Sequence, residues 1–148
     1  MSGDADLMAG EPPSGFQQLL GYRLAEWGED KAVIELTLDP QHCNRAGVVH
    51  GGVLATLIDT ACGFSATWCP FPGRVRRVMT LSLSTTFTGQ ARLGVIRAVG
   101  RKRGGGSRIV FCTAEVFDAE ARLIAMGEGT YRYRSGCEAP DGVPMEKT

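Results

Sequence analysis

The chain has 148 residues, of which 43% are hydrophobic and 22% are charged, and its formal net charge is zero. These values are typical of one globular domain of ordinary size. A net charge of zero argues against a nucleic-acid binder or an anionic-membrane binder, which would carry a basic excess. No stretch reaches the roughly 18 apolar residues that a membrane-spanning helix needs.

The two ends of the chain are predicted to be flexible. Residues 1–13 are rich in Gly, Pro and acidic residues and lack the apolar centre of a secretory signal, and residues 136–148 have a similar composition. The folded domain is therefore predicted to span residues 14–135. The five cysteines are scattered and show no zinc-site spacing, so we expect reduced thiols, no metal and a cytoplasmic protein.

The first half of the domain predicts one long helix between simpler elements. Residues 14–21 indicate a short helix, and residues 31–39 alternate as a strand with one buried face. A polar loop follows over residues 41–49. Residues 52–68 are apolar around most of a helical circumference, so this helix is expected to be buried on most sides.

The second half of the domain reads as strands throughout. Alternating or apolar runs cover residues 78–88, 93–103, 107–118 and 122–134. Consecutive strands with short connections predict an antiparallel meander. The predicted fold class is therefore α+β, with a curved antiparallel sheet wrapped around one long central helix.

The order of elements and one motif resemble a known family. The motif NxxGxxHGG occupies residues 44–52, and Asp59 follows nine residues after its histidine. This pattern resembles the hotdog-fold thioesterases and, more narrowly, those of the phenylacetate-degradation (PaaI-like) type. The similar stretches extend over roughly residues 15–134.

The resemblance implies an activity and an assembly. Members of this family hydrolyse thioesters of coenzyme A or, less often, of acyl carrier protein. They need no cofactor, because coenzyme A is part of the substrate. They form dimers whose sheets join edge to edge, and often dimers of dimers. We therefore expect an acyl-CoA thioesterase that self-associates and has no nucleic-acid or membrane partner.

Asp59 is the candidate catalytic carboxylate. A carboxylate in an apolar helix must be paired, solvated or functional, because burying it alone is costly. It could activate a water molecule as a general base, or attack the thioester and form an anhydride, and the sequence leaves both routes open. A purely structural salt bridge or cap is the alternative.

Gly51 and Gly52 are the candidate groups for the oxyanion. The first N–H groups of a helix have no intrahelical partner, and they attract negative charge. The backbone N–H of Gly51 is predicted to be the main oxyanion donor, with Gly52 nearby. Alternatively, the two glycines only make the turn into the helix.

Asp59 and Gly51 are too far apart in one helix to act on the same thioester. They are separated by eight residues, which is roughly 12 Å at a rise of 1.5 Å per residue. An aspartate side chain reaches only a few ångströms. Two antiparallel helices related by a two-fold axis would bring each Asp59 near the partner's Gly51, so we expect a site shared by two subunits.

The resemblance assigns three further residues to the site. Asn44 and His50 correspond to residues near the thioester carbonyl, although Asn44 could instead hold its loop and His50 could be structural. Thr80 corresponds to a Ser or Thr that helps to hold the water. Strict alternation places Thr80 on the face opposite Met79 and Leu81, so a β-bulge or an intersubunit site is needed for this role.

A basic, glycine-rich turn is the candidate site for the nucleotide end of coenzyme A. Cations and free backbone N–H groups suit phosphate groups. The predicted contacts in this turn are Arg101, Lys102, Arg103, Gly104 and Ser107, and Gly52 is predicted to contact the substrate at the start of the helix. A solvated hairpin turn is the alternative, and the arginines at 74, 76 and 77 form a second candidate cluster.

Two other functions remain open at this stage. A non-catalytic acyl-CoA-binding protein would need no base, and a hotdog-type hydratase or dehydratase would also pair a helix carboxylate with a histidine. The HGG motif with Asn44 upstream favours the hydrolase. The sequence does not predict the acyl group.

Overall fold

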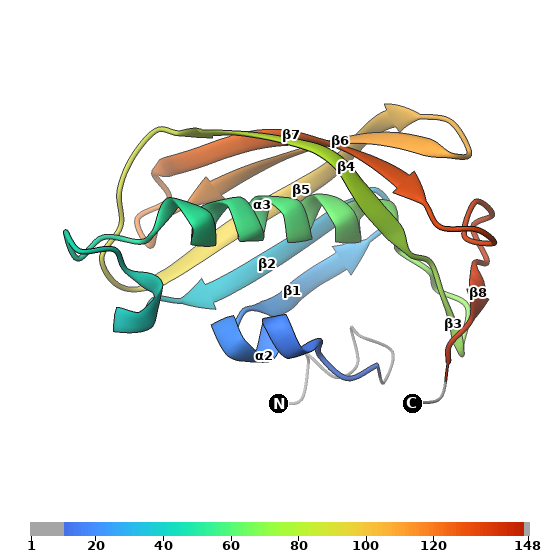
Figure 1. Cartoon of the computed structure of the whole chain (residues 1–148), viewed down its shortest axis with the longest axis horizontal. Coiled ribbons are helices and arrows are strands. Elements are labelled where there is room, and N and C mark those ends of the chain that lie inside the picture. The colour runs from blue at the N-terminus through green and yellow to red at the C-terminus, as the bar shows by residue number, and fades with distance from the viewer. Residues whose placement is uncertain (1–10, 147–148) are drawn as a thin grey trace.

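The computed structural model describes residues 11–146, so most of the predicted N-terminal segment, and the last two residues, lie outside the described part. Six antiparallel strands form one sheet in the order β1-β2-β5-β6-β7-β4, curved around helix α3 (Figure 1). The strands are β1 (Arg23–Gly28), β2 (Lys31–Thr37), β4 (Val78–Phe87), β5 (Val95–Gly105), β6 (Ile109–Phe117) and β7 (Leu123–Tyr133). The other elements are α2 (Gly15–Leu20), the 3-10 turn η1 (Pro40–His42), α3 (Gly51–Ala66), β3 (Arg74–Val75) and β8 (Val143–Pro144).

Helix α3 forms the centre of the core. It begins one residue earlier and ends two residues earlier than the sequence predicted, at Gly51 and Ala66. Leu57, Ile58 and Ala61 are fully buried against the sheet. The helix lies so close to β5 that a Cβ at Gly100 would sit 2.2 Å from the carbonyl oxygen of Ala61. Within residues 11–146, no helix is long and apolar enough to cross a membrane.

The strand order corrects one prediction. Strands β5, β6 and β7 form the expected meander, but β4 and β5 are not neighbours. Strand β4 pairs with β7 at one edge, and β5 pairs with β2. The simple meander was wrong because residues 88–94 are long enough to cross from one edge strand to the middle of the sheet (Figure 1).

Strand β1 was not predicted. It forms the other edge of the sheet and pairs only with β2. A shift in register between Leu24 and Glu26 interrupts its alternation, and Leu24 is its only fully buried side chain. A short, bulged edge strand gives a weak periodic signal.

The C-terminal segment has contacts that the sequence did not indicate. Cys137 is buried, and β8 pairs with β3. The guanidinium groups of Arg74 and Arg76 donate hydrogen bonds to backbone carbonyls within residues 137–142. Arg77 forms an ion pair with Glu11. The three arginines that formed the second candidate cluster for coenzyme A therefore bind chain segments of the protein itself.

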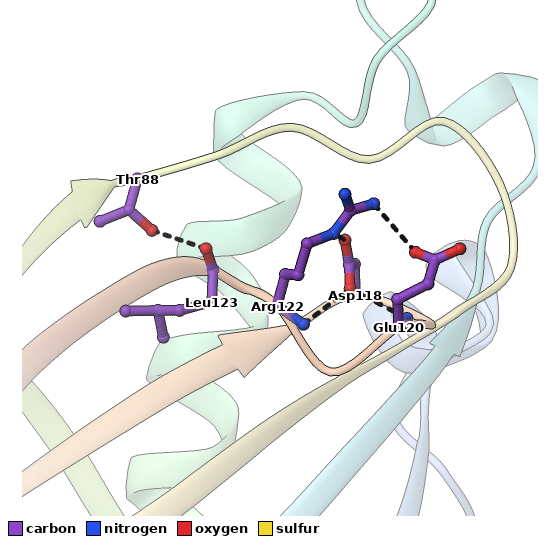
Figure 2. Close-up of polar contacts among 5 residues, drawn as sticks. All are labelled: Thr88, Asp118, Glu120, Arg122 and Leu123. Atoms are coloured by element: carbon purple, nitrogen blue, oxygen red, sulfur yellow. Dashed lines mark hydrogen bonds and ion pairs between the residues drawn. The ribbon is translucent and has the colours of Figure 1, made fainter.

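The turn between β6 and β7 is held by Asp118 (Figure 2). Its carboxylate accepts hydrogen bonds from the backbone N–H groups of Glu120 and Arg122 and from Arg122 Nε. These bonds, first that from the Arg122 backbone, lower the pKa of Asp118. Figure 2 also shows the Thr88 hydroxyl donating to the carbonyl of Leu123, which ties the connection after β4 to β7.

Candidate active site

The carboxylate of Asp59 is held from one side by two hydroxyl groups. Thr80 Oγ1 donates to Asp59 Oδ1 at 2.8 Å, and the Tyr131 hydroxyl donates to the same oxygen at 2.9 Å. In the described part of the chain, no hydrogen bond or ion pair reaches Oδ2. Every buried side-chain oxygen in that part of the chain has a hydrogen-bond partner, and Asp59 is half-buried. Since Oδ2 has no partner, it is not buried and is accessible at the surface of the site.

A β-bulge in β4 places Thr80 beside Asp59. Strand β4 changes register against β7 between Thr80 and Ser82, so Leu81 is the extra residue. Thr80 then pairs with Tyr131, which faces α3, whereas strict alternation would have turned it to the other face. A bulge was one of the two predicted ways to bring Thr80 to the site, and the structure contains it.

Tyr131 is a site residue that sequence reasoning missed. It lies in β7 and is 1% exposed, so in the sequence it looks like one more core residue of a strand. A Cβ at Gly129 would lie 2.5–2.8 Å from three atoms of the Tyr131 side chain. The only sequence signal for a special role of Tyr131 was therefore the pair of alternating glycines before it in "GEGTY". These glycines leave space for a large ring that lies along the strand.

A cavity of about 260 Å³ opens beside Asp59. It extends along the second half of α3, with Thr60 and Phe64 in its wall, and reaches both edge strands of the sheet through Trp27 of β1 and Val78 of β4. The wall is partly apolar around Asp59 and Thr80. A small acyl group and a water molecule could both be accommodated there.

The start of α3 presents one free backbone donor. His50 caps the helix, because its Nδ1 accepts a hydrogen bond from the N–H of Gly52 at 2.8 Å. Gly51 is the first helical residue, and its N–H has no hydrogen-bond partner among the described residues. The predicted pair of donors is thus reduced to one, since Gly52 is already occupied. Since Nδ1 accepts this hydrogen bond, a neutral His50 ring carries its proton on Nε2.

Asn44 organises the loop in front of the helix. Its Oδ1 accepts hydrogen bonds from the N–H groups of Ala46 and Val48. Both of its amide protons remain available, because no hydrogen bond in the described residues uses Nδ2. The backbone N–H of His50 donates to the carbonyl of buried His42 at 2.8 Å. The His42 ring accepts a hydrogen bond from the N–H of Asp39 and contacts the carbonyl oxygen of Leu20, so His42 is structural.

The basic turn lies apart from Asp59. Arg101, Lys102 and Arg103 are in the last part of β5, where a bulge separates Lys102 from Gly104, and Ser107 is exposed in the turn to β6. Arg103 donates to Thr113 Oγ1 at 2.7 Å. None of these residues lines the cavity beside Asp59.

The predicted site residues thus fall into separate groups within one chain. Asp59 and Thr80 lie together with the cavity, whereas Asn44, His50 and Gly51 lie at the start of α3 and are absent from the cavity wall. The third group is the basic turn. One chain therefore holds the candidate base, Asp59, apart from the candidate oxyanion donor, Gly51.

Comparisons with known proteins define the class. The family model described as the thioesterase superfamily matches residues 46–125. A Pseudomonas aeruginosa protein named "Putative esterase PA0474" is 31% identical over 130 residues, which cover 80% of this chain and 95% of that protein. Human acyl-coenzyme A thioesterase 13 is 29% identical, covering 78% of this chain and 82% of the human protein.

Solved structures agree on the fold. The structure of conserved protein PA5202 from Pseudomonas aeruginosa matches with a TM-score of 0.74 and 27% identity, covering 82% of this chain and 95% of the other. Thioesterase HI1161 from Haemophilus influenzae matches with a TM-score of 0.72 and 22% identity, covering 80% and 82%. The architecture is the hotdog fold, as predicted.

This chain therefore belongs to the thioesterase superfamily, and it is a thioester hydrolase. The predicted resemblance is confirmed at that level. The narrower PaaI-like type stays a prediction.

Proposed function

We propose that this protein hydrolyses acyl-CoA thioesters to a free acid and coenzyme A, in a site shared by two copies of the chain. The observation that carries the proposal is the accessible Oδ2 of Asp59 beside a partly apolar cavity. The similarity to human acyl-coenzyme A thioesterase 13 supports coenzyme A as the carrier. The cytoplasmic location is part of the same proposal, and all five cysteines are free thiols.

Asp59 acts on water through its accessible oxygen. With Oδ1 engaged by Thr80, Oδ2 takes the proton as the water attacks the thioester carbonyl. The proton then passes to the departing coenzyme A thiolate. Direct attack by Oδ2, followed by hydrolysis of the anhydride, uses the same geometry. Both routes need only protein groups and water, so no cofactor enters the proposal.

The oxyanion is stabilised at the start of a helix. Gly51 N–H is the available donor there, and the helix dipole favours the negative charge that develops on the carbonyl oxygen. Asn44 contributes a second donor through Nδ2, while its Oδ1 keeps the loop in shape. His50 contributes mainly by capping the helix, with Nε2 as a further donor.

Two copies complete one site. Gly51 and Asp59 lie in one unbroken helix, roughly 12 Å apart along its axis. The groups at the start of α3 do not reach the cavity of their own chain. We propose a dimer in which the partner's helix start faces Asp59, and the open edge of β4 supports an edge-to-edge contact. The assembly of two dimers into a tetramer stays a prediction.

The basic turn serves the nucleotide end of the substrate in this proposal. Exposed Arg101, Arg103 and Gly104 offer cations and backbone to phosphate groups, with Lys102 and Ser107 as further contacts. The exposed Gly52, at the start of α3, would contact the substrate near its thioester instead. None of the residues of this turn lines the cavity beside Asp59, as expected for a substrate whose reacting thioester is far from its nucleotide.

The test is release of free thiol from a panel of acyl-CoA thioesters. Asp59→Asn should lower kcat by roughly 10²–10⁴-fold while substrate binding persists. Glu29→Gln, which removes an exposed carboxylate in the β1–β2 turn, is the control and should leave kcat unchanged. Firm binding without turnover of any thioester would instead indicate a binding protein. Hydration of an enoyl-CoA without thiol release would indicate a hydratase.

A further inference from the structure

We infer that Tyr131 is a positioning residue for Asp59. Its hydroxyl orients the Asp59 carboxylate so that only Oδ2 faces the cavity. This inference rests on the proposed function, in which Asp59 is the catalytic carboxylate. It adds a role for a residue that the motif does not contain and that lies 72 positions further along the chain.

The hydroxyl of Tyr131 reaches two atoms of one residue. It lies 2.9 Å from Asp59 Oδ1 and 3.2 Å from the backbone carbonyl oxygen of Asp59. The Asp59 side chain is therefore fixed relative to its own turn of α3 and not only relative to strand β7. Since both Tyr131 and Thr80 donate to Oδ1, rotation of the carboxylate would break two charge-assisted hydrogen bonds at once.

The ring of Tyr131 is itself locked. It is 1% exposed, and the missing side chain of Gly129 provides the space in which it lies. Tyr131 and Thr80 are direct partners across the β7–β4 ladder, so the two donors are set by the same bulged pairing. A rigid pair of donors on the sheet thus faces one carboxylate on the helix.

The surroundings keep Tyr131 a neutral donor. Burial, and then the neighbouring Cys62 and Asp59, raise the pKa of its hydroxyl far above the ordinary value. Burial also raises the pKa of the Cys62 thiol to about 12, so this neighbour is neutral as well. The other charged groups near the cavity are Glu11, Arg74, Arg76 and Arg77. The arginines are engaged by Glu11 and by carbonyls of the C-terminal segment.

Tyr131→Phe tests the inference, with Tyr133→Phe as a matched control. Tyr133 lies two residues along the same strand, is also buried, and donates its hydroxyl to the carbonyl of Ala66 in α3 at 2.7 Å. Each variant loses the hydroxyl by which a buried tyrosine contacts the same helix, and only Tyr131→Phe loses contacts with Asp59. Differences between the two variants therefore report on Asp59 and not on packing.

The expected results separate positioning from stability. Tyr131→Phe should lower kcat about tenfold and change KM less than twofold, as expected for a lost hydrogen bond to the reacting group. Tyr133→Phe should change neither kcat nor KM. Gly129→Ala, which crowds the Tyr131 ring, should lower kcat in the same direction as Tyr131→Phe. Equal kcat values for Tyr131→Phe and Tyr133→Phe would overturn the inference.

A second measurement does not depend on activity. Carbon-13 NMR of the Asp59 carboxyl in the full-length protein should show a changed chemical shift in Tyr131→Phe, which loses the contact with that carboxyl, and the wild-type chemical shift in Tyr133→Phe. If the chemical shift changes but no thioester is hydrolysed, the proposed function fails and the positioning stands. If thioesters are hydrolysed and the chemical shift stays fixed in both variants, the positioning fails.

Discussion

Replacing Gly51 by proline removes one hydrogen atom from the proposed oxyanion site while leaving the helix able to form. Gly51 is the first residue of α3, where the N–H has no intrahelical partner and proline is well tolerated. The preceding residue, His50, has φ −66° and ψ 137°, the extended conformation that a following proline requires. The substitution therefore removes the donor without a backbone conflict.

The size of the effect follows from the role of the donor. Loss of one oxyanion donor costs roughly 10²–10³-fold in kcat, or about 3–4 kcal/mol. Proline also adds a Cβ, which would lie 3.3 Å from Phe87 Cζ, and this contact needs a matched control. Gly51→Ala adds the same atom at the same place and keeps the N–H.

The assay is thiol release by the two variants, with thermal unfolding measured in parallel. Gly51→Ala should retain most of the wild-type kcat, because a shift of a few tenths of an ångström by the exposed Phe87 ring relieves the contact. Gly51→Pro should unfold at a similar temperature and fall at least a hundredfold below Gly51→Ala in kcat. Equal kcat values in the two variants would show that Gly51 N–H is not the oxyanion donor.

Two further predictions concern stability. Gly100→Ala should lower the free energy of unfolding by about 3 kcal/mol in urea titrations, because its Cβ would meet the α3 backbone at 2.2 Å; Gly104→Ala, with open space around the added atom, should change it little. The lowered pKa of Asp118 predicts a stabilising contribution that is complete above the unfolded-state pKa of about 4 and is lost as the pH falls through the lower folded-state pKa. Asp118→Asn should therefore flatten the loss of stability below pH ~4, and an unchanged acid limb would contradict this.

The elements with a strong period could be predicted from the sequence. The central helix and strands β2 and β4 to β7 follow from apolar patterns that each element carries by itself. Strand β1 and the β3–β8 pair could not, because one is interrupted by a bulge and the others are two residues long. The neighbours of β4 depend on the path of the seven-residue connection 88–94, and no local sequence pattern indicates that path.

The candidate site divides in the same way. Asp59, His50 and Gly51 belong to one motif, so their spacing in the sequence carries the signal. Thr80 and Tyr131 lie together at Asp59 only because of the register of β4 against β7. A single extra residue in β4 reverses which face of the sheet its side chains point to. Tyr131 in particular has the periodicity of a core residue, and only its hydroxyl contacts distinguish it.

The bulge in β4 links the site to the proposed dimer. It turns Thr80 toward Asp59 and leaves Leu81 half-exposed at the edge of the sheet, where β4 has a neighbour on one side only. An open edge strand with exposed Met79, Leu81 and Phe87 is a surface that proteins normally cover. Phe87 also lies against Gly51, so the same strand borders the proposed oxyanion donor at one end and the Asp59 carboxylate near the other. A second copy that covers β4 would therefore meet both halves of the proposed site, which one chain alone holds apart.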